Sequence, residues 1–307
     1  MKKMCLALVS ALLMTLTAAN AADFEKGLAG ARAGDWATAL VEFGELAEQG
    51  HAEAQVMLGV MYNNGEGVVQ DHVAAAKWFT MAAEQGQDVA QFNLGSMYYN
   101  GSGVAQDYAE AIKWFRFAAV QGYADAQYNV GLMTAIGIGV AQEDYVAAVM
   151  WFRLAAVQGN ASAQSSLGWA YYIGEGVAQD YTEAFKWLTL AAEQGNAFAQ
   201  YNLGNLYVVG GGVVQDYAEA NKWFRLAAEQ GLASAQGDLG LSYYRGVGIV
   251  QGYTLAHMWG NIAVANGYRD GSLARDLAAE KMIQADIATA QRMASECMAS
   301  NYENCGY

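Results

Sequence analysis

Apolar residues in this chain fall into short blocks at helical spacing, and glycine-containing segments separate the blocks. Within residues 88–99, Ala90 and Leu94 lie on one side of a predicted helix. Gly101 and Gly103 then interrupt the pattern, because glycine reaches the positive φ values that a tight connection requires. The pattern predicts a helix, a short loop and a second helix.

The second helix of this block carries its own end signals. Asp107 is expected to cap its first turn, and Glu110, three residues later, would complete an acidic version of the capping box. The helix is expected to end before Gly122, at the C′ position that glycine favours. The same start signal recurs at Asp180 and Asp216.

The block repeats with a period of 36 or 37 residues, which tryptophan marks most clearly. The tryptophans are Trp78, Trp114, Trp151, Trp187, Trp223 and Trp259. Six full units are therefore predicted, at 51–86, 87–122, 123–159, 160–195, 196–231 and 232–267. Such a period is typical of stacked supersecondary arrays. We predict an all-α fold, a solenoid of helix–loop–helix repeats.

Glycine also recurs inside the predicted first helices, where it costs about 1 kcal/mol relative to alanine. These glycines are Gly59, Gly95, Gly131, Gly168, Gly204 and Gly240. A cost repeated in every unit predicts that neighbouring helices approach closely there. We interpret the tryptophan column in the same way, as packing between helices.

The segments on either side of the six units are expected to close the array. Residues 22–50 correspond to a partial unit that caps the N-terminal side. Residues 268–307 depart from the period and are predicted to hold two capping helices, at 272–282 and 286–299, and a tail. Terminal repeats of a solenoid are atypical because a polar outer face has to end the stack.

Each unit follows the pattern Ala-x-Ala-Gln-x-x-Leu-Gly-x-Met-Tyr-x-x-Gly-x-Gly-Val-x-Gln-Asp-Tyr-x-x-Ala-x-x-Trp-Phe-x-x-Ala-Ala-x-Gln-Gly. This pattern resembles the Sel-1-like repeat, a relative of the tetratricopeptide repeat, and the resemblance extends over residues 51–267. It implies a right-handed α/α superhelical solenoid that serves as an adaptor or ligand-binding scaffold. It also implies that the first helices line the inner, concave groove.

The first 21 residues are expected to direct export. Lys2 and Lys3 precede an uncharged apolar run, and the small residues Ala19 and Ala21 fit the pattern that signal peptidase recognises. We predict a signal peptide over 1–21, cleavage near Ala21, and a periplasmic or secreted location. The run is short for a transmembrane span, so no stable membrane insertion is expected; an N-terminal anchor is the alternative.

The composition narrows the class of partner. The chain has 16 basic and 30 acidic side chains, and its formal net charge of −14 repels phosphate backbones, so nucleic acid is not expected to bind. A hydrophobic content of 54% excludes an intrinsically disordered chain. We expect an elongated monomer whose partner is a protein or peptide.

Residues suited to catalysis or metal binding are scarce. His51, His72 and His257 share no metal-ligand spacing, and a zinc site needs three or four such ligands together. No metalloprotease, nucleophile-elbow or phosphate-loop motif occurs. We predict a non-catalytic scaffold with no catalytic residue, metal or cofactor. The alternative is a cell-envelope enzyme or muropeptide-binding factor, as in the β-lactamase-labelled branch of the same family, although that branch carries two cysteines per unit.

Comparison of the units with one another predicts where a partner binds. The positions that change lie on one face of the first helix, and one column of that face reads Met57, Asn93, Asn129, Ser166, Asn202 and Asp238. Asparagine offers a donor and an acceptor on a short stem, which suits the backbone of an extended peptide. The predicted groove residues are Asn93, Asn100, Asn129, Asn202 and Asp238, with apolar contact area from Phe92, Tyr128 and Tyr201. Alternatively, the asparagines only hydrate the groove or bond to the next helix.

The last two cysteines, Cys297 and Cys305, are predicted to form a disulfide after export. A helix continuing through both would hold them about 12 Å apart, which is too far for a bridge. Pairing therefore requires residues 301–304 to leave the helix and fold back. Two free thiols in a frayed terminus are the alternative.

Overall fold

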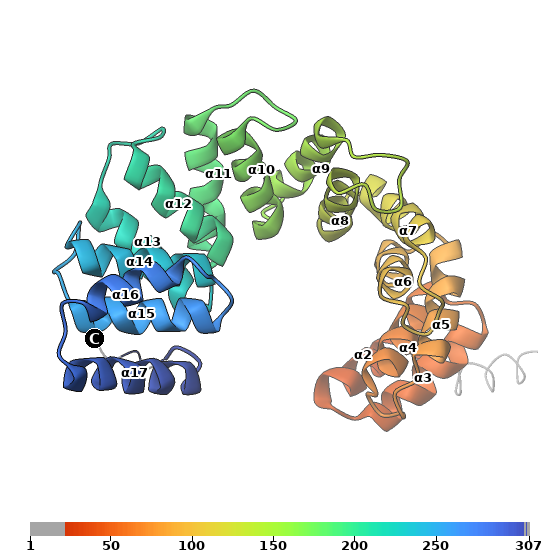
Figure 1. The fold of residues 1–307 in the computed structure, drawn as a ribbon. Coiled ribbons are helices and arrows are strands. Elements are labelled where there is room, and N and C mark those ends of the chain that lie inside the picture. The colour runs from red at the N-terminus through yellow and green to blue at the C-terminus, as the bar shows by residue number, and fades with distance from the viewer. Residues whose placement is uncertain (1–21, 304, 306–307) are drawn as a thin grey trace, which may run out of the picture. The chain divides into compact units, whose positions relative to one another are not determined.

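The structure is a computed structural model that describes residues 22–303 and 305. The predicted signal peptide over 1–21 lies outside the described residues. Within them every regular element is an α-helix, sixteen in all, and no strand is present (Figure 1). The helices are α2 (Phe24–Ala33), α3 (Trp36–Glu48), α4 (Ala52–Asn64), α5 (His72–Glu84), α6 (Asp88–Asn100), α7 (Tyr108–Val120), α8 (Ala124–Ala135), α9 (Tyr145–Val157), α10 (Ala161–Ile173), α11 (Tyr181–Glu193), α12 (Ala197–Val209), α13 (Tyr217–Glu229), α14 (Ala233–Arg245), α15 (Tyr253–Ala265), α16 (Gly271–Ala279) and α17 (Gln284–Ala299). The predicted all-α repeat fold is confirmed.

The described helices belong to two compact units, which divide after Glu143. The first unit contains α2–α8, and the second contains α9–α17. In both, each repeat supplies a first helix and a second helix, and short glycine loops connect them. Gly101 shows how the loop begins: its φ of 70° lets its amide bond back to the carbonyl of Met97 and close the helix.

The second helices start as predicted, but the capping box is only half formed. The carboxylate of Asp107 accepts hydrogen bonds from the backbone amides of Ala109 and Glu110, at 2.9 and 3.1 Å. The backbone amide of Asp107 itself donates to the carbonyl of Tyr98, 3.0 Å away. Glu110 is therefore not needed as an acceptor there, and it pairs with Lys113 instead, at 2.9 Å.

The glycines inside the first helices accommodate large side chains from the second helices. A Cβ atom on Gly204 would lie 2.6 Å from Cε1 of Phe224, and one on Gly168 would lie 2.7 Å from Cγ of Leu188. The predicted close approach is confirmed at these positions, where the residue after Trp223 or Trp187 fills the space, whereas Gly240 meets Ala274 and Gly260 instead. Phe224 and Leu188 are buried, whereas Trp187 and Trp223 are only half-buried. The tryptophans thus lie at the edge of the packing between helices.

A glutamine in each first helix links three consecutive helices. The amide of Gln200 donates to the carbonyl of Ala192 in the preceding repeat, at 3.2 Å, and its oxygen accepts from the amide of Gln230, at 2.7 Å. We call this arrangement the glutamine relay. The bond to the preceding repeat recurs at Gln55, Gln91, Gln127, Gln164 and Gln236. The relay satisfies buried amides that would otherwise be costly, and it fixes each repeat against the one before it.

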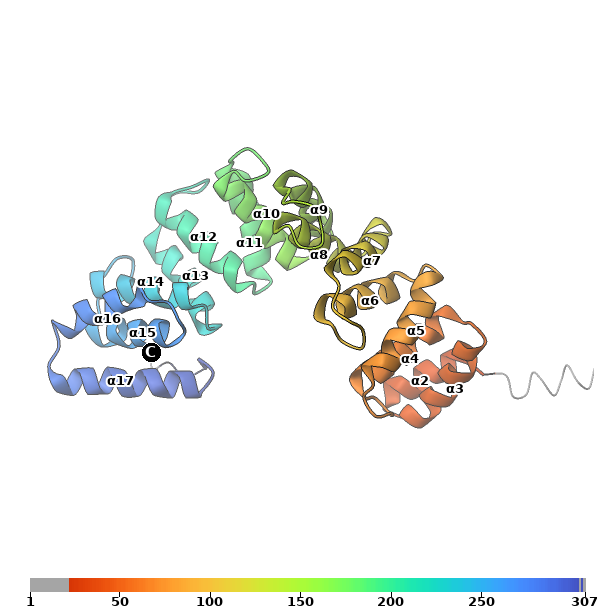
Figure 2. The same cartoon turned by 45° about the vertical axis from the view of Figure 1, so that its right-hand side comes forward.

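The second unit ends in helices that leave the repeat pattern. Both views show α17 beside α15 (Figures 1 and 2), and α15 is the only second helix whose tryptophan, Trp259, is fully buried among the described residues. After α17 the backbone turns at Asn301 and Tyr302, whose φ angles are 53° and 68°. This turn brings the two cysteines together in a disulfide with a Cα–Cα distance of 4.4 Å.

Candidate peptide-binding face

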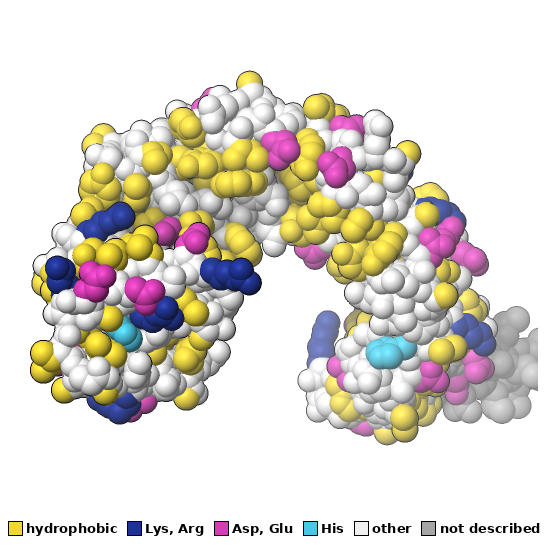
Figure 3. Space-filling view, viewed as in Figure 1, with side chains coloured by type: hydrophobic (Ala, Val, Ile, Leu, Met, Phe, Trp, Pro, Cys, Tyr) yellow, Lys and Arg dark blue, Asp and Glu magenta, His cyan; other side chains and the backbone are white. Residues whose placement is uncertain are grey.

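Within each compact unit, the positions that change between repeats lie on one side of the first helices, which we call the first-helix face. In the second unit it runs over α10, α12 and α14. Large apolar side chains are exposed on it: Phe198 is 65% accessible, and Trp169, Ile173 and Val209 are also exposed. Hydrophobic side chains gather over α10–α12 in the space-filling view (Figure 3). Exposed apolar side chains gathered on one face are typical of a contact surface.

A polar pair lies on the same face. The hydroxyl of Tyr201 in α12 donates a hydrogen bond to Oδ2 of Asp238 in α14, at 3.0 Å. Burial and the neighbouring carboxylate raise the pKa of Tyr201 to about 12, so the phenol stays protonated. Burial also raises the pKa of Asp238, while the bond from Tyr201 and the charge of Arg245 oppose that rise. The structure therefore brings together two of the residues that the sequence predicts for the groove.

Other predicted groove residues are less available. Asn202 is only 9% exposed, so little of its amide can reach a ligand. In the first unit, the amide of Asn93 donates to the carbonyl of Val89 in its own helix, at 2.8 Å. Asn129 and Tyr128 are half-buried and Asn100 is exposed.

From the sequence we expected the ring of Phe92 to supply apolar contact area to a ligand. In the structure much of that ring is covered. The ring lies 5.6 Å from that of Phe115 and 5.0 Å from that of Tyr123, so much of its surface packs between helices. Tyr201 is similar, since its ring lies 5.7 Å from that of Phe224. Both rings stand at a position of the first helix that points partly into the repeat. The accessible aromatic area on the first-helix face comes instead from Trp169 and Phe198.

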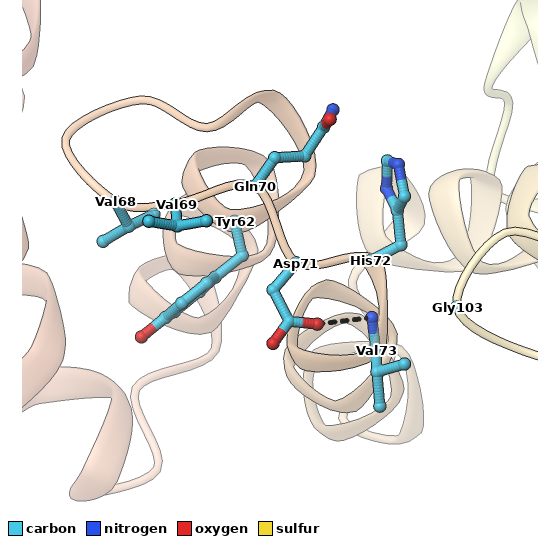
Figure 4. Close-up of a pocket in the computed structure, with 8 residues that line it drawn as sticks. All are labelled: Tyr62, Val68, Val69, Gln70, Asp71, His72, Val73 and Gly103. Carbon is cyan, nitrogen blue, oxygen red and sulfur yellow. Dashed lines mark hydrogen bonds between the residues drawn. The ribbon is translucent and has the colours of Figure 1, made fainter.

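A shallow depression lies beside the loop of the first full repeat (Figure 4). Tyr62, Val69 and His72 line it together with Asp71, whose carboxylate accepts from the amide of Val73 at 2.9 Å. His72 Nδ1 lies 3.1 Å from the side-chain oxygen of Asn63. The carboxylate of Asp71 caps a helix, and the imidazole of His72 has a partner in Asn63. Both side chains therefore serve the structure of the repeat loop.

A second depression lies between α13 and the loop that follows α14. Two cations line it, but Lys222 pairs with Glu219 at 2.5 Å and Arg225 donates to the hydroxyl of Tyr243 at 2.8 Å. These interactions favour a structural role for both cations.

A metal centre in residues 22–303 would require several His, Cys, Asp or Glu side chains to lie close together. No three side chains of the His, Cys, Asp and Glu types converge there to hold a metal ion. His257 is buried, which lowers its pKa, and its Nδ1 lies 2.9 Å from the amide nitrogen of Asn261. None of the helices described is long and apolar enough to cross a membrane.

Consecutive helix pairs, joined by relays and closed by capping helices, define the chain as an all-α repeat protein. The sequence profile described as Sel1 repeat matches it six times, at residues 52–87, 88–123, 124–160, 161–196, 197–232 and 233–268. The chain belongs to the Sel1 repeat family.

One solved structure supports this assignment, and others are similar to this chain. A Sel1 repeat protein from Oxalobacter formigenes is 33% identical, with a TM-score of 0.72 over 80% of this chain and 97% of that one. A protective antigen of uropathogenic Escherichia coli with an SLR fold is 27% identical over 88% of this chain and 81% of its own, with a TM-score of 0.47. An immunity protein from Pseudomonas aeruginosa is 21% identical over 72% of this chain and 83% of its own, with a TM-score of 0.43. A search of curated proteins found no match.

Proposed function

We propose that this protein is an exported scaffold that binds a protein or an extended peptide along the first-helix face. The observation that carries the proposal is the combination of exposed Trp169 and Phe198 with the polar pair Tyr201 and Asp238 on successive first helices. The aromatic side chains supply contact area, and the polar pair offers hydrogen-bonding groups beside it. The Sel1 repeat family, whose members act as interaction scaffolds, supports the same function.

Peptide selection tests the binding. The chain without residues 1–21 serves as bait for a phage-displayed library of random dodecapeptides, and a selected peptide is labelled for fluorescence polarisation. Replacing Trp169 and Phe198 by serine should weaken its binding by at least about tenfold, because the main apolar area is lost. Ile283→Ser is the control, since Ile283 is 68% exposed but lies between α16 and α17. If no peptide is selected, or if the double variant binds as well as the wild type, the proposal fails.

Export is tested separately, through the N-terminal segment. The segment 1–21 carries the basic and apolar regions of a signal peptide. Expression of the full chain in a Gram-negative host should yield protein in the periplasm or the medium that begins at Ala22. Protein that keeps Met1 and stays in the cytoplasm would contradict export without affecting the binding proposal.

A further inference from the structure

The second helix of the third repeat, α9, presents an apolar stripe to solvent. Val146, Met150, Leu154 and Val157 recur every three or four residues, so they share one side of the helix. All four are exposed, with accessible fractions between 48% and 66%. We call these four residues the α9 stripe.

In other repeats, two of the four positions of the α9 stripe usually carry charge. At the register of Met150 stand Lys77, Lys113, Lys186 and Lys222; at the register of Val157 stand Glu84, Glu193 and Glu229, with Val120 in the second repeat. The registers of Val146 and Leu154 are uncharged in every full repeat. Each of these lysines is exposed, so the helix pair itself turns this register outward, in both units. Met150 and Val157 therefore replace a lysine and a glutamate by apolar residues, and together with the exposed Val146 and Leu154 they make the apolar stripe continuous along α9.

The last repeat shows what covers such a surface. In α15, Met258 stands at the register of Met150 and Ile262 at the register of Leu154, and both are fully buried. They belong to the same apolar cluster as Ala290 and Ala294 of α17, the helix that packs against α15 (Figures 1 and 2). An apolar residue at this register is thus buried in this protein where an amphipathic helix lies over it.

We propose that the α9 stripe docks an amphipathic helix of a partner protein, with lysine or arginine beside its apolar face. The basic flank follows from charge complementarity. The chain carries 30 acidic and 16 basic side chains, and the exposed Glu193 stands one repeat beyond Val157. The cation on the stripe's own side of α9, Arg153, is already bonded to the hydroxyl of Tyr171, at 2.7 Å. A second copy of the chain fits less well, because it brings the same negative charge. Moreover, four side chains fall short of the roughly 800 Å² per partner that a stable interface buries.

The test restores the charged pattern of the other repeats. M150K/V157E gives α9 the lysine and glutamate that α5, α11 and α13 already carry, so the helix should fold unchanged, and the net charge stays the same. The probe is a synthetic helical peptide of leucine and lysine in an amphipathic pattern, labelled for fluorescence polarisation. The double variant should bind it at least about tenfold more weakly than the wild type.

A gain-of-function variant completes the design. K186M/E193V creates the same apolar pattern on α11, again without a change in net charge, and it should add a second binding site for the probe. Equal binding by wild type and M150K/V157E would show that bulk charge alone attracts the peptide and would overturn the proposal, as would no binding by the wild type. A dimer in sedimentation equilibrium that M150K/V157E dissociates would assign the stripe to a second copy and overturn it as well. The first-helix variants leave the stripe intact, so failure here is distinguishable from failure of the proposed function.

Discussion

The hydroxyl of Tyr201 lies 3.0 Å from Oδ2 of Asp238 and joins the first helices of two successive repeats. The bond stabilises the charged form of a carboxyl group whose pKa burial raises. The two residues therefore affect each other: the phenol limits the rise in the pKa of Asp238, and the carboxylate adds to the effect of burial in raising the pKa of Tyr201.

Removal of the phenol hydroxyl should expose this dependence. In Tyr201→Phe the carboxylate loses its hydrogen bond while its burial persists, so the pKa of Asp238 should rise further. Titration of the side-chain carboxyl carbon by NMR measures it directly. Tyr207→Phe, on the same helix but without a bond to Asp238 among the hydrogen bonds described, should leave that pKa unchanged.

The same carboxyl group should make stability depend on pH. Its pKa is raised above the unfolded value of about 3.9, so between the two values the folded chain binds more protons than the unfolded chain. Its contribution to stability is therefore lost as pH rises through that window and regained as pH falls. Asp238→Asn should be at least as stable as the wild type at pH 7, and the difference should shrink below pH 4. A melting-temperature difference that does not change with pH would contradict this.

Two glycine variants should move stability in opposite directions. Gly204→Ala places a methyl group 2.6 Å from the Phe224 ring in a packed interior, so we expect a loss of about 1–3 kcal/mol despite the better helix propensity of alanine. Gly44→Ala, in the middle of α3, meets no atom within 4 Å and should stabilise by about 0.5–1 kcal/mol. Thermal denaturation of both proteins measures the contrast, and a stabilising Gly204→Ala would refute the packing role.

The glutamine relay should account for a measurable share of the stability of each repeat. Gln200→Leu removes two hydrogen bonds of a buried side chain, to the carbonyl of Ala192 and from the amide of Gln230, which should cost about 1–3 kcal/mol. Gln215→Leu is the matched control, because Gln215 is exposed and bonds only to Val208 and Tyr217, at the two ends of its own loop, and it should cost less than about 0.5 kcal/mol. Urea denaturation measures the free energy of unfolding of both variants. Equal losses for Gln200→Leu and Gln215→Leu would show that the relay adds no stability of its own.

The disulfide between Cys297 and Cys305 should stabilise the C-terminal cap. The closed loop is short, so the chain-entropy account gives about 2–3 kcal/mol. Replacing both cysteines by serine should destabilise the cap. The expected result is faster amide hydrogen exchange in α17. Thiol labelling of protein recovered from the cell envelope checks the bond itself: two reactive thiols in the absence of reductant would contradict pairing.

Local signals predicted the fold well, and long-range contacts limited the prediction of the site. The period, the helix starts at residues such as Asp107 and the packing at Gly204 depend on neighbours one repeat away or less. The relay was missed because a buried glutamine and an exposed one look alike in a sequence, although its invariance in every unit was a usable signal. A core ring and a binding ring produce the same column, so the sequence alone does not show that Phe92 packs against Phe115 and Tyr123. Phe198 and Trp169 both stand among the changing positions, but the pattern does not give their exposure.

The relay also bears on how such a chain changes length. Gln200 reaches only to Ala192 in the repeat before it and to Gln230 in its own repeat. An in-frame duplication or deletion of one repeat's coding segment therefore meets an identical set of donors and acceptors on either side. The number of repeats can therefore change by slippage in the gene while every pair of neighbouring repeats keeps its relay hydrogen bonds. Selection can then act on the few surface positions that differ between repeats.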